Sequence, residues 1–353
     1  MAITNPTDSN KVNNKQSFFR RYMRVWKWLG WIFGVIAVLA LLVWIAFQVS
    51  PWPNSLLIRA AFDKNSAKVE QALGKYVPAN ITEVENTQYR SNDKDARFDA
   101  FYPTGTDKQL PTIVWVHGGG WVSGSKDDID NYMKILAGRG FTAISVNYSI
   151  APEKQYPVPI QQLNDALGYI QANAKGLHVD DTRIVMAGDS AGSQIVAQMA
   201  NIITSQSYAS DIGIQPKLPA SKLKGLLLTC GAYDLSLPDY NGPFGKFLRT
   251  VLWAYSGTQD FQHDPKLKTA SVVNYVTSHF TPAFITAGNA DPLLGQSTEF
   301  AQKLQSLDVY TSTLFYPTDH QPQLNHEYQF DLDTTDGQNA LDEMVNFARQ
   351  RTE

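Results

Sequence analysis

A serine within Gly188-Asp-Ser-Ala-Gly192 has the clearest potential for covalent chemistry in this chain. The pentapeptide follows an apolar run at 183–187 that predicts a strand, and it precedes a helical pattern at 193–204. In a G-x-S-x-G motif, the glycines permit a sharp turn that exposes the serine above a sheet, at a helix N-terminus. Such pentapeptides often occur by chance, but this strand-turn-helix setting predicts that Ser190 is a nucleophile.

A glycine loop, His117-Gly-Gly-Gly-Trp121, follows another predicted strand. Glycine backbones allow peptide N–H groups to approach a developing oxyanion. We therefore expect two of Gly118, Gly119 and Gly120, preferably the later pair, to form an oxyanion hole with the N–H of Ala191. A phosphate-binding loop is the alternative, but this loop has no Walker lysine and lies about 70 residues before the serine motif.

These two motifs together resemble the hormone-sensitive-lipase-like branch of the α/β-hydrolases, a family of esterases and lipases. A third segment, Asn147-Tyr-Ser-Ile-Ala-Pro-Glu153, resembles the family's Y-R-L-A-P-E sequence, and the resemblance covers about residues 85–350. It implies an α/β-hydrolase fold and a serine carboxylesterase for esters with short to medium acyl chains, with no cofactor and no metal. Ser149 departs from the family's arginine, and Ser193-Gln194 departs from Gly-Asn or Ala-Asn. Both departures could alter packing around the pocket.

The catalytic acid is expected between the serine and the histidine in the chain. Asp291, in Gly288-Asn-Ala-Asp-Pro-Leu293, follows a predicted strand and resembles the family's D-P-L segment. An aspartate before proline is also common as a turn or cap residue, and Asp234, after an earlier strand, is the competing acid. Because Asp234 comes too early in the topology, we expect it to shape a loop and Asp291 to orient the base.

Two histidines, His320 and His326, follow Asp291, so the general base is one of them. His326 falls in the loop between the last predicted strand and the last helical region, and it resembles the family's histidine. That histidine is usually followed closely by an aromatic residue, a pattern that Tyr328 fits imperfectly. His320 is the alternative base, or else a solvated loop residue. We expect His326 to take the proton of Ser190 and to deliver it to the leaving alcohol.

The elements that position these residues alternate between apolar strands and amphipathic helices. Strands are predicted at 112–117, 142–147, 183–187, 223–230, 283–287 and 311–315, and helices at 131–138, 159–175, 193–204, 297–307 and 340–351. The alternation predicts a mostly parallel sheet with helices on both faces, in a catalytic domain at 85–353. Residues 235–280 interrupt it and predict a cap insertion. Four aromatic residues of this cap could line an acyl pocket or form a lid core: Phe244, Phe247, Trp253 and Tyr255.

The N-terminal segment departs from this globular pattern. Residues 29–47 are nineteen uncharged, mostly apolar residues, enough for about 28 Å of helix. Six basic residues precede this run, which predicts a basic, flexible cytoplasmic tail at 1–28, a transmembrane anchor at 29–49 and an extracytoplasmic catalytic domain. A cleaved signal peptide, giving a secreted protein, is the alternative, but its apolar stretch is normally shorter and no good cleavage site follows. A helical pattern within 50–84 predicts a linker helix or a part of the cap.

The composition limits the remaining functions. With 43% apolar and 18% charged residues, the chain is typical of a globular enzyme and not of a disordered protein. A net charge of -3 gives no basis for a nucleic-acid partner, and Cys/His spacings typical of zinc sites are absent. The single cysteine, Cys230, is expected in a buried strand. The predicted partners are an ester substrate and a lipid bilayer, and no pattern predicts an oligomeric state.

Two other functions compete with the esterase hypothesis. The same triad hydrolyses amides, so an amidase or small-peptide hydrolase is one alternative. The other is a catalytically inactive extracellular binding module. Such modules usually lose a triad or oxyanion residue, whereas every candidate residue is present here.

Overall fold

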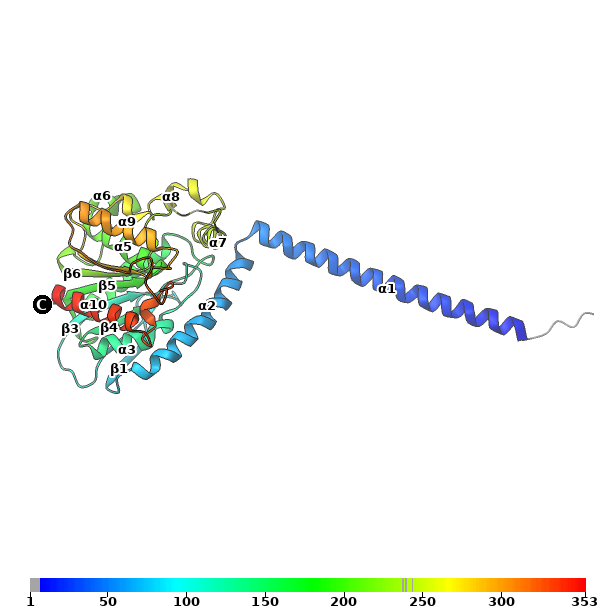
Figure 1. The fold of residues 1–353 in the computed structure, drawn as a ribbon, viewed down its shortest axis with the longest axis horizontal. Helices are drawn as coiled ribbons and strands as arrows, with labels where there is room; N and C mark the ends of the chain where they lie inside the picture. Colours follow the sequence, from blue (N-terminus) through cyan, green and yellow to red (C-terminus); the bar gives the residue numbers. More distant parts are fainter. Residues whose placement is uncertain (1–6, 237, 239, 243) are drawn as a thin grey trace, which may run out of the picture. The chain divides into compact units, whose positions relative to one another are not determined.

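The computed structural model describes residues 7–236, 238, 240–242 and 244–353 (Figure 1). The chain divides into two units, Met1–Pro53 and Asn54–Glu353. The first contains one long helix, and the second contains every residue expected to take part in chemistry.

Helix α1 (Thr7–Val49) is the described part of the first unit. Its segment Ser17–Val49 is long and apolar enough to cross a membrane, and its most apolar stretch is not buried. By length and composition, this segment fits either a membrane span or a signal anchor. Residues 7–28 are helical, not the flexible tail that the sequence predicted, since no glycine or proline interrupts them. Residues 1–6 of that predicted tail lie outside the described residues.

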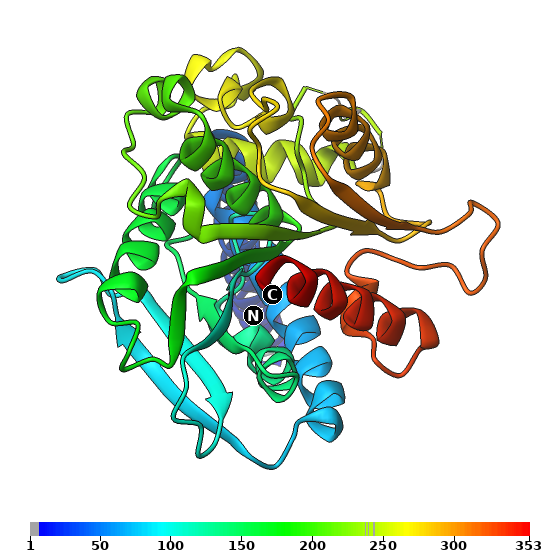
Figure 2. The same ribbon diagram turned by 90° about the vertical axis from the view of Figure 1, so that its left-hand side faces the viewer.

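An eight-stranded sheet in the order β1-β2-β4-β3-β5-β6-β7-β8 forms the centre of the second unit. All six predicted strands are present and pair in parallel: β3 (Leu110–Val116), β4 (Thr142–Val146), β5 (Val179–Asp189), β6 (Leu223–Thr229), β7 (Ala283–Ala287) and β8 (Thr311–Phe315). Helices cover both faces of the sheet (Figure 2). The predicted mostly parallel α/β architecture is therefore confirmed.

Two further strands, β1 (Ile81–Gln88) and β2 (Arg97–Pro103), extend one edge of the sheet in antiparallel fashion. The sequence analysis did not predict them. The β1 sequence ITEVENTQ is mostly polar, and none of its residues is fully buried. Such an edge strand lacks the apolar run that marks the central strands.

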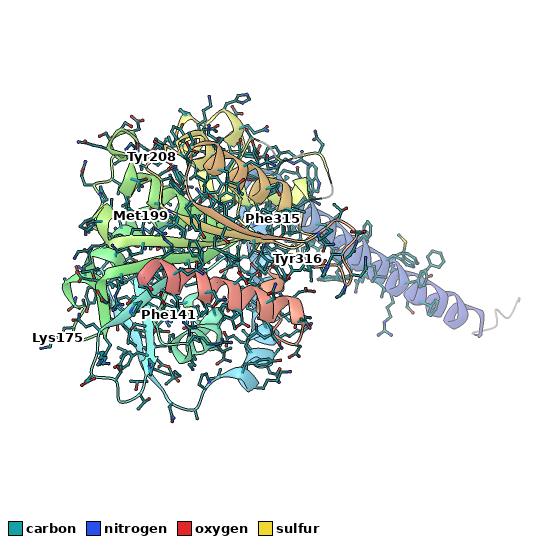
Figure 3. All side chains as sticks on the ribbon, turned by 60° about the vertical axis from the view of Figure 1, so that its left-hand side comes forward. Phe141, Lys175, Met199, Tyr208, Phe315 and Tyr316 are labelled. Atoms are coloured by element: carbon teal, nitrogen blue, oxygen red, sulfur yellow. The ribbon has the colours of Figure 1, made fainter. Side chains whose placement is uncertain are left out.

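Side chains of the central strands alternate between two apolar clusters, one on each face of the sheet. Along β3, Val114 and Val116 belong to the first cluster, whereas Ile113 and Trp115 belong to the second. Figure 3 labels Met199 in the first cluster and Phe141 in the second. The first is covered by α4 (Val158–Ala172), α5 (Ala191–Thr204) and α9 (Leu294–Ser306), and the second by α3 (Asp130–Gly138) and α10 (Thr335–Thr352).

The predicted insertion at 235–280 contains only short helices, and none of its described residues forms a strand. It comprises α7 (Gly245–Ser256), η4 (Phe261–His263), α8 (Pro265–Lys268) and η5 (Val272–Asn274). The helical pattern within 50–84 forms α2 (Trp52–Leu73), and Phe62 of α2 lies 5.9 Å from Phe247 of α7, ring centroid to ring centroid. Helix α2 therefore packs beside the insertion and is not a free linker.

The remaining short helices are η1 (Gly74–Tyr76), η2 (Lys126–Ile129), α6 (Gln206–Ile212), η3 (Ala220–Lys222) and η6 (Tyr328–Phe330).

Candidate active site

Ser190 lies at the turn between β5 and α5, with a φ of 50°. The glycines on either side make this turn possible. A Cβ on Gly192 would lie 2.0 Å from the carbonyl oxygen of Val116, and one on Gly188 would lie 2.6 Å from the carbonyl carbon of Gly192. Ser190 is not a glycine, so its φ of 50° costs about 1–3 kcal/mol of backbone strain. The surrounding structure must offset this cost.

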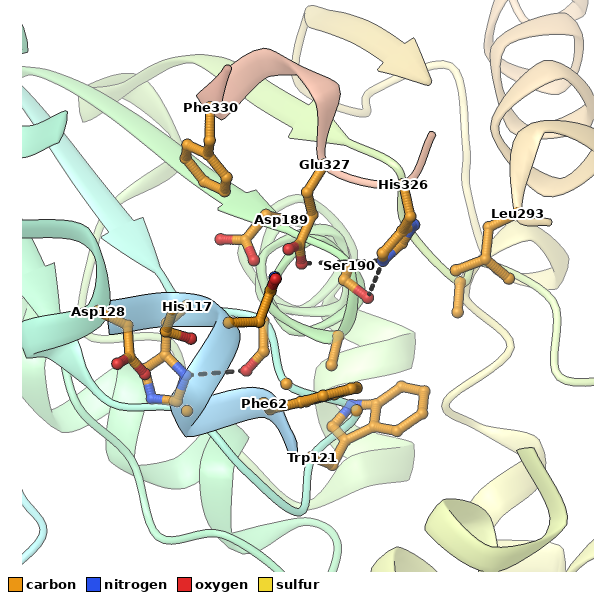
Figure 4. A pocket seen from close by; sticks show the side chains of 18 of the residues that line it. Phe62, His117, Trp121, Asp128, Asp189, Ser190, Leu293, His326, Glu327 and Phe330 are labelled. Atoms are coloured by element: carbon orange, nitrogen blue, oxygen red, sulfur yellow. Dashed lines mark hydrogen bonds and ion pairs between the residues drawn. The ribbon is translucent and has the colours of Figure 1, made fainter. Parts of the chain in front are cut away.

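His326 joins Ser190 to Asp291 through two hydrogen bonds. Its Nε2 lies 3.0 Å from Ser190 Oγ, and its Nδ1 lies 2.9 Å from Asp291 Oδ2 (Figure 4). Asp291 follows β7 and has a fully buried side chain, whereas His326 lies in the loop between β8 and α10. The carboxyl ends of three parallel strands thus bring together a hydroxyl, an imidazole and a carboxylate that are far apart in the sequence.

The competing acid and base lie elsewhere. His320 Nε2 is 2.9 Å from Asp336 Oδ2, and no hydrogen bond among the described residues joins it to Ser190. Asp234 accepts hydrogen bonds from the backbone N–H and the hydroxyl of Ser236, which fixes a loop as predicted. The geometry therefore favours Asp291 and His326 over both alternatives.

The glycine loop lies directly beside the serine turn. Gly119 and Gly120 have φ values of 99° and 60°, and a Cβ on Gly119 would lie 2.2 Å from the carbonyl oxygen of Ser123. The backbone N–H of Gly118 interacts with the buried carboxyl group of Asp189. Within the described chain, no hydrogen bond is found for the N–H groups of Gly119 and Gly120. These two donors are free to face a substrate oxygen, together with the N–H of Ala191 at the first turn of α5.

His117 supports this loop as a neutral side chain. Burial lowers the pKa of His117 to about 4, so its ring is uncharged at physiological pH. Its Nδ1 lies 2.9 Å from the carbonyl oxygen of Gly118, and its ring stacks on Tyr148 with centroids 4.3 Å apart. These contacts hold the His117 ring against the glycine loop, where it orders the backbone and takes no part in proton transfer.

The imidazolium form of His326 is stabilised by its surroundings. Burial disfavours this form, but Cys230, the hydrogen bond to Asp291 and the charge of Glu327 favour it more strongly, so the pKa of His326 lies well above its ordinary value. Burial also raises the pKa of Cys230, to about 11. These surroundings therefore favour the imidazolium, the form that protonates a leaving alcohol.

Residues that depart from the family's motifs make specific contacts. Gln194 accepts a hydrogen bond from the indole of Trp121 at 3.2 Å and donates one to the carbonyl oxygen of Ala270 at 3.0 Å. It therefore links the glycine loop to the insertion. Ser193 Oγ donates to Gly188 O at 2.6 Å, and Ser149 Oγ donates to Asp95 at 2.9 Å.

A cavity of about 430 Å³ opens above Ser190 and His326 (Figure 4). The insertion contributes Phe244, Phe247 and Leu248, and α2 contributes Phe62, Asn65, Ser66 and Val69. Of the four aromatic residues expected from the insertion, Trp253 and Tyr255 do not line this cavity. Tyr255 is fully buried and stacks on Trp121 with centroids 5.1 Å apart, about two helical turns beyond the lining residue Leu248. The sequence analysis did not anticipate Phe62, Glu327 or Phe330 in the lining.

Two groups of side chains have donor atoms close enough to hold a metal ion. In the first, Cys230, Asp291 and His326 lie together, but both imidazole nitrogens already bond to Asp291 and Ser190. Cys230 is buried as expected, but it lies just beyond β6 with a φ of 43° and is not part of the strand. The second group comprises Asp99, Asp127 and Asp130, among which the Lys126 ammonium already lies 2.6 Å from Asp99. Neither arrangement favours a resident metal.

Comparisons with known proteins agree with this architecture. The family model described as BD-FAE matches residues 98–304. Carboxylesterase NlhH of Mycobacterium tuberculosis is 32% identical over 226 residues, which cover 62% of this chain and 68% of that protein. The putative alpha/beta hydrolase R526 of Acanthamoeba polyphaga mimivirus is 26% identical over 231 residues, covering 63% of this chain and 64% of that protein.

Solved structures share the fold at lower sequence identity. Esterase B from Lactobacillus rhamnosis has a TM-score of 0.72 at 20% identity, covering 84% of this chain and 95% of that one. An esterase from Pyrobaculum calidifontis has a TM-score of 0.67 at 22% identity, covering 85% and 94%. The alignments thus include nearly all of each solved chain.

Proposed function

Because the chain belongs to the BD-FAE family, a hormone-sensitive-lipase-like family of α/β-hydrolases, we propose that it is a serine carboxylesterase. The observation that carries the proposal is the hydrogen-bonded series Ser190–His326–Asp291 at the base of a largely apolar cavity. Esterase names among its sequence relatives support the same substrate class.

The proposed reaction proceeds through an acyl-enzyme. Ser190 attacks the ester carbonyl while His326 Nε2 takes its proton, and the imidazolium then protonates the leaving alcohol. Asp291 holds the imidazole in the required tautomer and stabilises its charged form. The N–H groups of Gly119, Gly120 and Ala191 bind the oxyanion, each worth about 2.7–4 kcal/mol of barrier. Water activated by His326 then releases the acid, so the cycle requires neither a metal nor a cofactor.

We expect short and medium acyl esters to be the better substrates. The cavity of about 430 Å³ must hold both halves of the ester, and it lies toward the small end of ligand pockets, which span about 300–1,000 Å³. Hydrolysis of p-nitrophenyl acetate, butyrate and decanoate by the full chain in detergent should therefore give a higher kcat/KM for the first two.

Matched p-nitroanilides of the same acids separate this proposal from its alternatives. Faster cleavage of the anilides would favour an amidase. If the folded protein hydrolyses neither set and no fluorophosphonate probe labels it, the esterase proposal is wrong and a binding role takes its place.

We further propose that α1 anchors the enzyme in a membrane with its basic N-terminus in the cytoplasm and its catalytic unit outside. The uncharged stretch at 29–47 and the basic residues before it support this orientation. The full chain should remain in the membrane pellet after an alkaline carbonate wash, and intact-mass analysis should find residues 1–49 still present. Protein recovered in the soluble fraction without its N-terminal segment would instead indicate a cleaved signal peptide.

A further inference from the structure

Glu327 directly follows the proposed general base and places its carboxylate inside the active-site cavity. Its backbone adopts a left-handed conformation with a φ of 62°. Its Oε1 lies 3.8 Å from His326 Nε2, and 32% of the side chain is exposed. Figure 4 shows this carboxylate between Asp189 and the Ser190–His326 pair.

This distance places Glu327 beside one half of the substrate. In the proposed mechanism, His326 Nε2 delivers a proton to the oxygen of the leaving alcohol. That oxygen must come within about 2.6–3.2 Å of the nitrogen. A carboxylate 3.8 Å from the same nitrogen therefore borders the alcohol half of the ester.

Apart from the imidazoles of His117 and His326, the ionisable side chains around this position are acidic. Asp128, Asp189 and Glu327 line the cavity, and the described lining residues include no lysine or arginine. Burial, together with the nearby charge of Glu327, raises the pKa of Asp189 well above its usual range, although Trp115 donates a hydrogen bond to it at 2.7 Å. Burial and the carboxylate of Glu327 therefore disfavour the ionised form of Asp189, whereas 32% of the Glu327 side chain is exposed.

Two aromatic rings of the cavity also favour the binding of a cation. Phe62 and Phe330 line the same cavity, and Figure 4 shows Phe330 on the side where Asp189 and Glu327 lie. Ring faces attract ammonium groups, and a nearby carboxylate adds to that attraction. An anionic substituent would meet three carboxyl groups, with no lysine or arginine among the described lining residues.

We propose that Glu327 makes the enzyme selective for esters whose alcohol half carries a cationic nitrogen close to the ester oxygen. The inference rests on the esterase function proposed above and adds its substrate class. Glu327 is then a specificity residue that contacts the alcohol moiety, distinct from the three residues that perform the acyl transfer.

Three butyrate esters of similar size test the proposal on the full chain. They are butyrylcholine, its uncharged isostere 3,3-dimethylbutyl butyrate, and the anionic 2-sulfoethyl butyrate. We expect kcat/KM to fall in that order, with the cationic ester on the order of tenfold above the neutral one, as one desolvated charge interaction allows. Glu327→Gln should bring the cationic and neutral esters to within about twofold of each other.

Two control variants make the result specific. Glu327→Asp keeps the charge and should keep the preference, whereas Asp128→Asn removes one charge beside His117, away from His326, and should leave most of the preference intact (Figure 4). Circular dichroism and thermal unfolding report whether each variant has folded, because Glu327 also acts on the pKa of His326 and can change the rate on every ester. Equal rates of the wild type on cationic and neutral esters, or a preference that survives Glu327→Gln, would overturn the inference while leaving the esterase function standing. If the wild type hydrolyses none of the three esters, both the inference about Glu327 and the proposed esterase function are wrong.

Discussion

Replacing Ser190 with alanine is expected to lower kcat/KM for p-nitrophenyl butyrate by about 10⁴- to 10⁶-fold, because the change removes the hydroxyl that His326 contacts. Ser190 Oγ is the atom that lies 3.0 Å from His326 Nε2, and loss of a serine nucleophile commonly costs this much. Residual activity should come from oxyanion binding and general-base attack by water. Steady-state kinetics and labelling with a fluorophosphonate probe measure the two consequences separately, and labelling should disappear.

Ser210→Ala is a matched control for this variant. Ser210 is an exposed serine of α6 that donates a hydrogen bond to Gln206 O, and it does not line the cavity. It should label and hydrolyse like the wild type. If Ser190→Ala still labels at a rate close to that of Ser210→Ala, the nucleophile lies elsewhere and the mechanism proposed for this cavity fails.

The central strands could be predicted because a strand that is buried on both faces of a parallel sheet requires a nearly continuous run of apolar residues. The strands β7 (Ala283–Ala287) and β8 (Thr311–Phe315) have the bounds that the sequence predicted, since short apolar or β-branched runs end where loops begin. The serine turn was equally predictable, because the close approach of Gly192 to Val116 O excludes every residue with a side chain. Edge strand β1 was not predicted, because its exposed positions do not require apolar residues and so leave no apolar run in the sequence.

The walls of the cavity could not be predicted to the same degree. Phe62 comes from α2 and Phe330 from η6, and each reaches the cavity only through tertiary packing that no local pattern encodes. One contact explains how α2 is held. The Arg59 guanidinium donates to Val122 O at 2.7 Å and pairs with Glu153 of the A-P-E segment. The motif around Glu153 gives no sign in the sequence that its partner, Arg59, would come from α2.

Asp291→Asn is expected to lower kcat by about 10⁴-fold with a much smaller change in KM, because the variant keeps the shape of the side chain and loses its charge. Asp291 Oδ1 accepts a hydrogen bond from the backbone N–H of Leu293 at 2.7 Å. The amide oxygen of asparagine can keep that bond only if its NH₂ group faces His326 Nδ1. A donor at that position favours the tautomer with its proton on Nε2, which cannot accept the proton of Ser190.

The pH profile of the same variant distinguishes this role from simple loss of structure. The hydrogen bond that His326 Nδ1 donates to Asp291 is one of the interactions that raise the pKa of His326, so its loss should move the acidic limb of the kcat profile to lower pH. Asp234→Asn removes an equal charge from a loop after β6, where the carboxylate bonds only to Ser236 among the described residues, and it should shift neither limb. A comparable loss of kcat in both variants would show that the effect is general destabilisation. A loss confined to Asp291→Asn, with a shifted acidic limb, would mean that this carboxylate acts through the imidazole, as a residue that orients and stabilises the base must do.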